Sequence, residues 1–255
     1  MRMKEKNRAV PFRIKLADIV VGIEPIHNDM KEYCSEYITE KMSDFQVKIE
    51  EVDIEFERVR SKKEAQREGR EVLEYSGSYL ETLAVYRKIA EKLPIYNTFL
   101  FHGSAIAVDD NGYLFTAKSG TGKSTHTKLW REYFANRAIM VNDDKPLLKV
   151  TADGVRVYGT PWDGKHRLSS NVSVPLKAIC ILERDTNNHI EEINVGEAYQ
   201  MLLQQTYRPL DKGAVIQTLK LLDLLKTHVK FYRLGCNMDL EAAKVAYEGM
   251  NGGCI

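Results

Sequence analysis

The sequence has no apolar run that approaches the roughly 20 residues needed to cross a lipid bilayer. Residues 1–8 are basic, as at the start of a secretory signal, but the segment that follows contains Arg13, Lys15 and Asp18. These charges interrupt the apolar stretch that a signal sequence requires. We therefore expect a cytoplasmic protein with no secretory signal and no membrane partner.

Cysteine is scarce, and the positions of the few cysteines argue against two further classes of protein. There is no Cys-x-x-Cys pair, and no histidine lies at metal-ligand spacing from the four cysteines, which are Cys34, Cys180, Cys236 and Cys254. This pattern favours reduced thiols in a cytosolic protein over a disulfide-stabilised secreted domain or a zinc site.

An excess of charge of one sign is also absent. The 37 lysines and arginines nearly balance the 36 aspartates and glutamates, which leaves a formal net charge of +1. A net charge of that size creates no strong field that attracts nucleic acid or an anionic membrane. We therefore expect neither as the main partner.

The composition that remains is typical of an ordinary globular protein, with 44% hydrophobic and 29% charged residues. A chain of 255 residues is long enough for one large domain or for a core with a smaller lobe. The residue pattern changes near residue 97. We predict an N-terminal α+β region over residues 1–96, of unclear role, and a core over residues 97–255.

In the N-terminal region, alternating apolar residues predict strands, and apolar residues spaced by three and four predict helices. The charged segment 61–69 is expected to be exposed. The predicted elements are a strand over 12–21, a short helix over 28–39, two strands or a bulged strand over 45–58, and a helix over 81–93.

In the core, an apolar strand is predicted over 99–108, and Asn111-Gly112 is a strong signal for a tight hairpin turn before a return strand over 113–116. Strands that alternate with helices are typical of an α/β fold. The further predictions are helices over 124–136, 197–207, 212–226 and 240–250, strands over 138–141, 176–183 and 229–234, and a hairpin over 147–158.

A glycine-rich run follows the return strand and resembles the phosphate-binding pattern G-x-x-x-x-G-K-[ST]. Two glycines let the backbone point successive N–H groups at one anion, the next helix adds its positive end, and the lysine adds a full charge. A serine after the lysine offers a hydroxyl to Mg2+. The predicted phosphate-binding residues are Ser119, Gly120, Thr121, Gly122, Lys123, Ser124 and Thr125.

One position departs from this pattern, because Ala117 stands where the first glycine is expected. The remaining diagnostic positions are present, and the run lies between an apolar strand and an amphipathic helix, which is the context that the motif requires. The alternative interpretation is a glycine-rich turn between a strand and a helix, with a surface lysine.

An acidic pair and a histidine add a possible chemistry to this loop. Asp143 and Asp144 end a short apolar strand, where an aspartate in P-loop proteins commonly holds Mg2+. The other aspartate can take a proton from an attacking hydroxyl. The alternative is a turn cap before Pro146. His102, in the strand that precedes the hairpin, can tune an aspartate or serve as a hydrogen-bonded core residue.

These features together resemble the HPr kinase/phosphorylase family, which has a P-loop fold of the phosphoenolpyruvate carboxykinase type. The resemblance rests on His102-Gly103, the Asn-Gly hairpin, the glycine-rich run and the Asp143-Asp144 pair, and it covers about residues 99–185. Residues 1–95 do not resemble the N-terminal domain of that family.

The resemblance implies phosphorylation of a serine or threonine with ATP and Mg2+. It implies that Asp143 is the general base, assisted by His102, and that Lys123 holds phosphate. Ser124 and Asp144 would bind the metal ion, and Asp163 is a candidate for a further acidic metal ligand. Phosphoryl transfer also needs cations beside the transferred group, for which the candidates are Lys165, Arg167 and Arg208.

Several functions remain open at this point. The first is a kinase that acts on a hydroxyl of a protein, a peptide or a small molecule, and the second is a nucleotide-gated regulatory or binding module without transfer. A carboxykinase-type lyase and phosphorolysis of a phosphoserine are further alternatives. The pattern does not identify the acceptor. Relatives of this family often form rings, so a homo-oligomer remains open, although the sequence contains no coiled-coil heptad.

Overall fold

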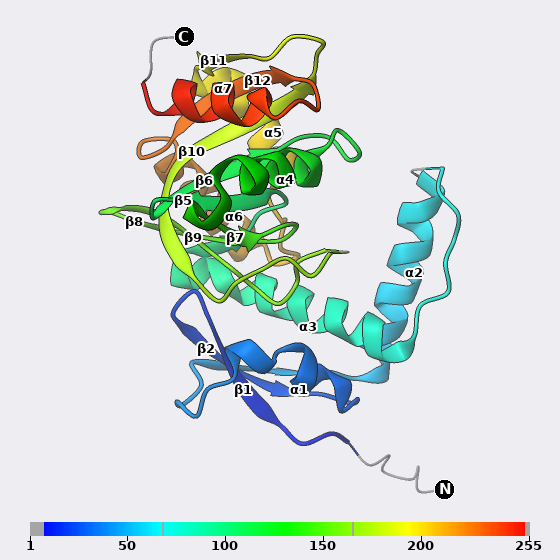
Figure 1. The fold of residues 1–255 in the computed structure, drawn as a ribbon. Helices are drawn as coiled ribbons and strands as arrows, with labels where there is room; N and C mark the ends of the chain where they lie inside the picture. The colour runs from blue at the N-terminus through cyan, green and yellow to red at the C-terminus, as the bar shows by residue number, and fades with distance from the viewer. Residues whose placement is uncertain (1–7, 68, 165, 253–255) are drawn as a thin grey trace, which may run out of the picture. The chain divides into compact units, whose positions relative to one another are not determined.

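The computed structural model describes residues 8–67, 69–164 and 166–252. The chain divides into two compact units, Met1–Lys92 and Leu93–Ile255 (Figure 1). Within the described residues, no helix combines the length and apolar character needed to span a membrane. The fold is mixed α/β.

The N-terminal unit contains a three-stranded sheet in the order β1-β2-β3, formed by Phe12–Leu16, Ile19–Glu24 and Phe45–Lys48. The first pair is antiparallel and the second is parallel. The single strand predicted over 12–21 is therefore a hairpin. Its turn residues, Ala17 and Asp18, have φ of 47° and 66°, as a two-residue turn between twisted strands requires.

Three α-helices complete this unit: α1 (Asp29–Tyr33), α2 (Glu51–Arg67) and α3 (Gly77–Lys92). The strands predicted over 45–58 are wrong beyond Lys48, because α2 begins at Glu51 and includes most of the charged segment 61–69. Buried Asp53 and Glu57 lie one helical turn apart on α2 and both bind Arg87 of α3. This pairing favours the helix over the alternating apolar pattern.

The C-terminal unit is built on a nine-stranded sheet in the order β4-β8-β9-β10-β6-β5-β7, to which β12 adds beside β10 and β11 beside β12. The long strand β10 pairs with β9 through its first residues and with β6 and β12 through the rest. The strands are β4 (Thr98–Leu100), β5 (Ser104–Val108), β6 (Asn111–Thr116), β7 (Ala138–Asn142), β8 (Leu147–Thr151), β9 (Gly154–Tyr158), β10 (Ser173–Arg184), β11 (His189–Ile193) and β12 (Lys230–Cys236).

Helices cover both faces of this sheet (Figure 1). Alternate side chains of each strand enter different cores, since successive strand residues point to opposite faces. Ile106 packs with residues of α4 (Lys123–Phe134) and α7 (Glu241–Met250), including Trp130. Ala105 packs in the other core with α5 (Val195–Gln205) and α6 (Lys212–Leu225) and with apolar residues of β8 and β9.

The helices and strands predicted after residue 120 are confirmed to within a few residues, although β11 was not predicted. The strand predicted over 99–108 is interrupted at His102 and Gly103, which lie outside β4 and β5. The hairpin before the glycine-rich run is also confirmed, because β5 and β6 pair in antiparallel register.

The turn of that hairpin differs from the expected one. Its central residues are Asp109 and Asp110, with φ of 49° and 62°, whereas Asn111 pairs with Val108 at the start of β6. Gly112 serves packing within the sheet, because a Cβ there would lie 2.8 Å from Val157 Cγ1.

Candidate functional site

The predicted site residues converge on one edge of the C-terminal sheet. Because β5 is antiparallel to both β6 and β7, the carboxyl ends of β6 and β7 lie at the same edge as the first residue of β5, Ser104. The glycine-rich run leaves β6 at this edge, and the acidic pair follows β7. Ligands of open α/β sheets bind at such an edge, outside the carboxyl ends of the strands.

The glycine-rich run adopts a backbone that only glycine accepts readily. Gly120 has φ of +77° and Gly122, the N-cap residue of α4, has φ of +123°. Ala117 replaces the first expected glycine without strain, because it is not among the residues with positive φ and its side chain is fully buried in the core. The departure from the sequence pattern therefore requires no unusual backbone.

The exposed side of the run is open. Ser119 and Gly120 are exposed, and a Cβ built on Gly120 meets no atom within 4 Å. Thr121 folds back on the loop, where its hydroxyl and its backbone N–H both donate to the Lys118 carbonyl. The exposed Ser124 and Thr125 lie in the first turn of α4, where unpaired N–H groups and the helix dipole attract an anion.

Lys123 is the charged residue of the loop. Its Nζ donates to the Ala117 carbonyl oxygen at 3.4 Å. Burial lowers the pKa of Lys123, although the charges of Asp144 and Asp143 oppose this effect. The ammonium group therefore lies in a partly desolvated place near both carboxylates, where an added phosphate would stabilise its charge.

Asp143 is buried, with 6% of its surface exposed, and is held by a chain of hydroxyl groups. Ser104 Oγ donates to Asp143 Oδ1 at 2.6 Å, and Thr127 Oγ1 lies 2.9 Å from Ser104 Oγ. A hydroxyl has one proton to donate, so Thr127 is the donor to Ser104 when Ser104 donates to the carboxylate. This chain connects Asp143 to α4.

Asp144, which with Asp143 lies in the turn after β7, has different partners. Its carboxylate oxygens lie 3.3 Å from His102 Nε2 and 3.1 Å from Lys145 Nζ. Burial raises the pKa of Asp144, but the His102 hydrogen bond and the Lys145 charge outweigh burial and bring it to about 2. His102 was expected to assist Asp143, but its Nε2 contacts Asp144 instead.

Asn142 organises the acidic turn, a role that the sequence reasoning missed. Its side chain is fully buried and its Oδ1 accepts hydrogen bonds from the backbone N–H groups of Asp144 and Lys145 at 2.9 and 2.6 Å. Its Nδ2 donates to the carbonyl oxygens of Thr160 and Trp162 at 3.0 and 3.3 Å. One side chain therefore joins the acidic turn to the segment that carries Asp163.

Asp163 lies on this joined segment and is 4% exposed. Its Oδ2 accepts a hydrogen bond from Ser169 at 2.9 Å. Its Oδ1 is buried and accepts no hydrogen bond, and Arg167 Nε lies at a distance of 3.7 Å from this oxygen. Burial raises the pKa of Asp163, and the Asp143 charge adds to this effect. The neighbouring Gly164 approaches Asp144, since a Cβ on Gly164 would lie 3.3 Å from Asp144 Cβ.

The three cations that were candidates for the transferred group are distributed over two segments. Arg167 is beside Asp163, as described, and Lys165 lies outside the described residues. Arg208 donates to the Leu203 carbonyl oxygen at 3.4 Å. Its neighbour Tyr207 is hydrogen-bonded to Leu100, so Arg208 belongs to a segment that runs beside the His102 region.

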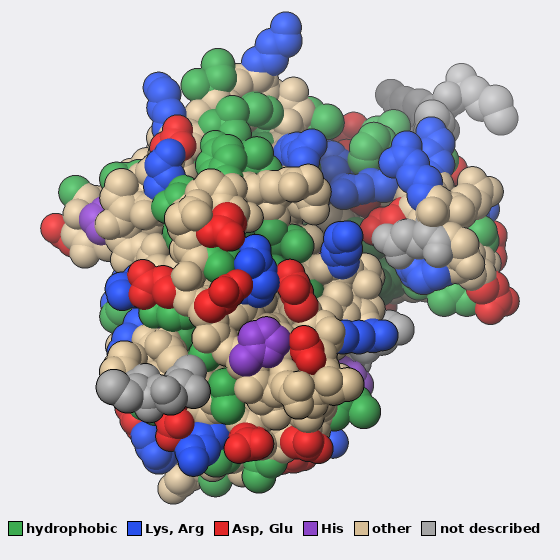
Figure 2. Space-filling model, turned by 90° about the horizontal axis from the view of Figure 1, so that it is seen from above, with side chains coloured by type: hydrophobic (Ala, Val, Ile, Leu, Met, Phe, Trp, Pro, Cys, Tyr) green, Lys and Arg blue, Asp and Glu red, His purple; other side chains and the backbone are tan. Residues whose placement is uncertain are grey.

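Among residues 8–67, 69–164 and 166–252, no group of three or more His, Cys, Asp or Glu side chains is placed to hold a metal ion. Cys34, Cys180 and Cys236 form no disulfide bond, and Cys254 lies outside the described residues. The face drawn in Figure 2 intersperses acidic and basic side chains.

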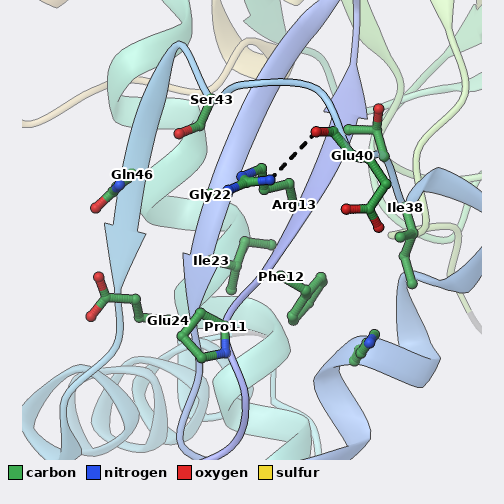
Figure 3. A pocket seen from close by; sticks show the side chains of 12 residues that line it. Pro11, Phe12, Arg13, Gly22, Ile23, Glu24, Ile38, Glu40, Ser43 and Gln46 are labelled. Carbon is green, nitrogen blue, oxygen red and sulfur yellow. Dashed lines mark hydrogen bonds between the residues drawn. The ribbon is translucent and has the colours of Figure 1, made fainter.

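A pocket of about 260 Å³ occurs in the N-terminal unit (Figure 3). It lies on the β1–β2–β3 sheet and is lined by residues that include Phe12, Gly22 and Gln46. At its rim, Arg13 Nη1 donates to the Glu40 carbonyl oxygen at 3.4 Å. None of the predicted site residues lines this pocket.

Comparison with known proteins finds a likeness among solved structures but none in sequence. No family model matches the chain, and no curated protein matches it in sequence. Among solved structures, the chain is similar to the HPr(Ser) kinase/phosphatase from Coxiella burnetii, at 12% identity and a TM-score of 0.34, over 60% of this chain and 97% of that chain. A TM-score of this size is too low for any residue role to be transferred from that protein.

Proposed function

We propose that this chain is an ATP-dependent phosphotransferase that uses Mg2+ to phosphorylate a hydroxyl, in first place a serine of a protein or peptide. The observation that carries the proposal is the hydroxyl chain from Thr127 on the helix after the glycine-rich loop, through Ser104, to the buried carboxylate of Asp143. In the proposal, this chain of hydrogen bonds links the proton acceptor, Asp143, to the helix after the loop that binds the phosphates. The sequence resemblance supports a core of the phosphoenolpyruvate carboxykinase type.

The roles of the residues follow from their surroundings. Backbone N–H groups of the loop and the N-terminus of α4 bind the phosphates, and Lys123 adds a full charge. The acceptor oxygen forms a bond to the γ-phosphorus while the bond from that phosphorus to the bridging oxygen of ADP breaks. The acceptor proton passes to Asp143, whose position is fixed by Ser104.

The donor atoms present fit magnesium, which prefers hard oxygen ligands. Ser124 contributes a hydroxyl and Asp144 and Asp163 contribute carboxylates, and Asp163 Oδ1 is a buried oxygen without a hydrogen bond. In the proposal these residues hold Mg2+, which neutralises charge on the transferring phosphoryl group.

A second candidate is a nucleotide-gated binding module that does not transfer phosphate. It is favoured by the N-terminal unit, which is compact, has its own sheet and pocket, and carries none of the predicted site residues. Such a module would bind ATP in the same loop and use the occupancy to control a partner.

One experiment separates the candidates. The purified chain is incubated with γ-labelled ATP and Mg2+ in the presence of whole-proteome protein, a serine-containing peptide library or a metabolite pool. Label on a protein or peptide supports the proposed activity, and label on a metabolite alone identifies a small-molecule kinase. Tight ATP binding without labelling of any pool supports the binding module.

A further inference from the structure

Arg184 is placed over the glycine-rich loop by the register of two parallel strands. Ile181 of β10 pairs with Thr116, the last residue of β6. Arg184 ends β10 three residues later, so it extends past the point where β6 turns into the loop. The sequence reasoning assigned it no role, because it stands about 60 residues after the motif.

The guanidinium of Arg184 binds the loop through backbone carbonyl groups. Its Nη2 donates to the Gly120 carbonyl oxygen and its Nε donates to the Thr121 carbonyl oxygen at 3.3 Å. A peptide unit is planar, with its N–H opposite to its C=O. The hydrogen bond from Arg184 to the Thr121 carbonyl therefore directs the N–H of the next residue, Gly122, away from Arg184. Gly122 is the N-cap residue of α4.

The loop needs such an external contact because its own sequence makes it flexible. Glycine loses more conformational freedom on ordering than any other residue, and Gly120 and Gly122 both adopt positive φ. Within the loop, the contacts are those of Thr121 and Lys123 with the backbone of residues 117 and 118. Arg184 fixes the peptides between these two anchor points.

The charge of Arg184 is available to a ligand. In the part of the chain that the structure describes, no acidic side chain forms an ion pair with Arg184, which is exposed. The neighbouring Glu183 pairs instead with Arg233 of β12 at 3.3 Å. A cation with a rigid fork of donors is suited to hold carbonyl groups and attract phosphate at the same time.

We propose that Arg184 is a positioning residue that holds the glycine-rich loop in its anion-binding conformation and so sets the affinity for nucleotide polyphosphate. This inference rests on the proposed nucleotide-binding function of the loop. Preorganisation removes the ordering cost that a ligand otherwise has to offset on binding. Loss of Arg184 therefore weakens nucleotide binding without changing the groups that carry out transfer.

The test compares Arg184→Gln, Arg184→Lys and the control Arg233→Gln, an arginine on the adjacent strand that pairs with the carboxylates of Glu183 and Glu191 and not with the loop carbonyl groups. MgATP affinity is measured by calorimetry, and KM and kcat by labelled transfer. We expect Arg184→Gln to raise Kd and KM for ATP about tenfold with kcat within about twofold. Arg184→Lys should recover part of the loss, and Arg233→Gln should bind as the wild type does.

The outcomes that overturn the inference are distinct. If the wild type binds MgATP and Arg184→Gln binds it equally well, the role of Arg184 is wrong while the proposed function stands. If Arg184→Gln lowers kcat and thermal stability with an unchanged KM, the residue is merely structural and the inference fails. If the wild type binds no nucleotide, the proposed function and the inference fail together.

Discussion

Ser104 Oγ donates a hydrogen bond to Asp143 Oδ1 at 2.6 Å, and both side chains are buried. Ser104 begins β5 and Asp143 follows β7, so the contact joins two strands that pair side by side. Through Thr127 it also reaches the helix that follows the glycine-rich loop. The arrangement makes the position of the proposed base dependent on the helix of the proposed phosphate site.

Ser104→Ala removes the donor and leaves Asp143 Oδ1 buried without it. We expect a loss of about 1–3 kcal/mol in the free energy of unfolding and a marked fall in kcat with ATP affinity retained. The measurements are urea unfolding, calorimetry with MgATP and labelled transfer.

Thr218→Ala is the matched control, because Thr218 is a buried hydroxyl on α6 that donates to the backbone of its own helix. An equal fall in kcat in both variants would contradict the role of Ser104.

Asn142→Asp keeps the shape and the acceptor oxygen of Asn142 but removes its amide donor. The variant loses the hydrogen bonds to Thr160 and Trp162 and introduces a carboxyl group at a fully buried position. We expect the free energy of unfolding to fall by at least about 2 kcal/mol, with lowered transfer because the acidic turn and the Asp163 segment separate. Asn187→Asp, at an exposed position, should stay within about 0.5 kcal/mol of the wild type. Equal stability of the two variants would show that Asn142 does not join these segments.

Features formed by residues that are close together in the chain could be predicted from the sequence, whereas contacts between distant residues could not. The glycine-rich loop, the helix after it and the acidic turn lie within about 30 residues of chain, so neighbouring residues were enough to predict them as one site. Ser104 and Arg184 contact residues that are distant in the chain, and strand register brings them to Asp143 and to the loop. Asn142 binds its own turn and also the distant Thr160 and Trp162, which no local pattern identifies. The position of Thr127, one helical turn after Lys123, is a signal that could have been found.

In the N-terminal unit, the pattern over residues 45–58 failed for a different physical reason. Apolar residues alternate at Val47 and Ile49 and, after a break, again at Val52, Ile54 and Phe56, so the start of α2 shows the spacing of a strand. The buried ion pairs of Asp53 and Glu57 with Arg87 stabilise the helical conformation of this segment. They depend on a residue of α3 that no local pattern identifies. Tertiary contacts of this kind override local propensity.

Lys123→Met tests the electrostatic cost of the loop lysine. Burial lowers the pKa of Lys123 below its ordinary value of 10.5. The folded state therefore disfavours the charged form of Lys123, so the free energy of unfolding rises as the pH approaches 10.5, where the unfolded state also loses the proton. We expect the apolar variant to lose MgATP binding without a loss of thermal stability.

Lys128→Met provides the control, because Lys128 is exposed on the same helix and pairs only with Glu132. It should bind MgATP as the wild type does. The measurements are a thermal melt and a calorimetric titration of both variants. Retained ATP binding in Lys123→Met would contradict the phosphate role of the lysine.

His126→Gln tests a pH dependence of stability. Burial lowers the pKa of His126 to about 3, and its Nε2 accepts a hydrogen bond from Trp130 at 3.0 Å. The unfolded state takes up a proton near pH 6.5 that the folded state does not bind until about pH 3, so stability falls as pH drops between these values. The contribution is about 1.4 kcal/mol per pH unit.

Glutamine can accept the same indole hydrogen bond but does not titrate, so His126→Gln should show a shallower decline of the unfolding free energy below pH 6.5. Urea unfolding at a series of pH values measures this decline. His228→Gln, at an exposed position, should follow the wild type. If His126→Gln declines as steeply as the wild type, the buried histidine is not the source of the acid sensitivity.

The central claim is that Asp143 accepts the proton of a hydroxyl that receives the γ-phosphoryl group of ATP bound at the glycine-rich loop. The most direct measurement is transfer of labelled phosphate by the wild type and by Asp143→Asn, with MgATP affinity of both determined alongside. We predict transfer by the wild type and a loss of about a hundredfold to ten-thousandfold in Asp143→Asn, with ATP affinity preserved. Transfer at an undiminished rate by Asp143→Asn, or ATP binding by the wild type without transfer to any protein, peptide or metabolite pool, would contradict the claim.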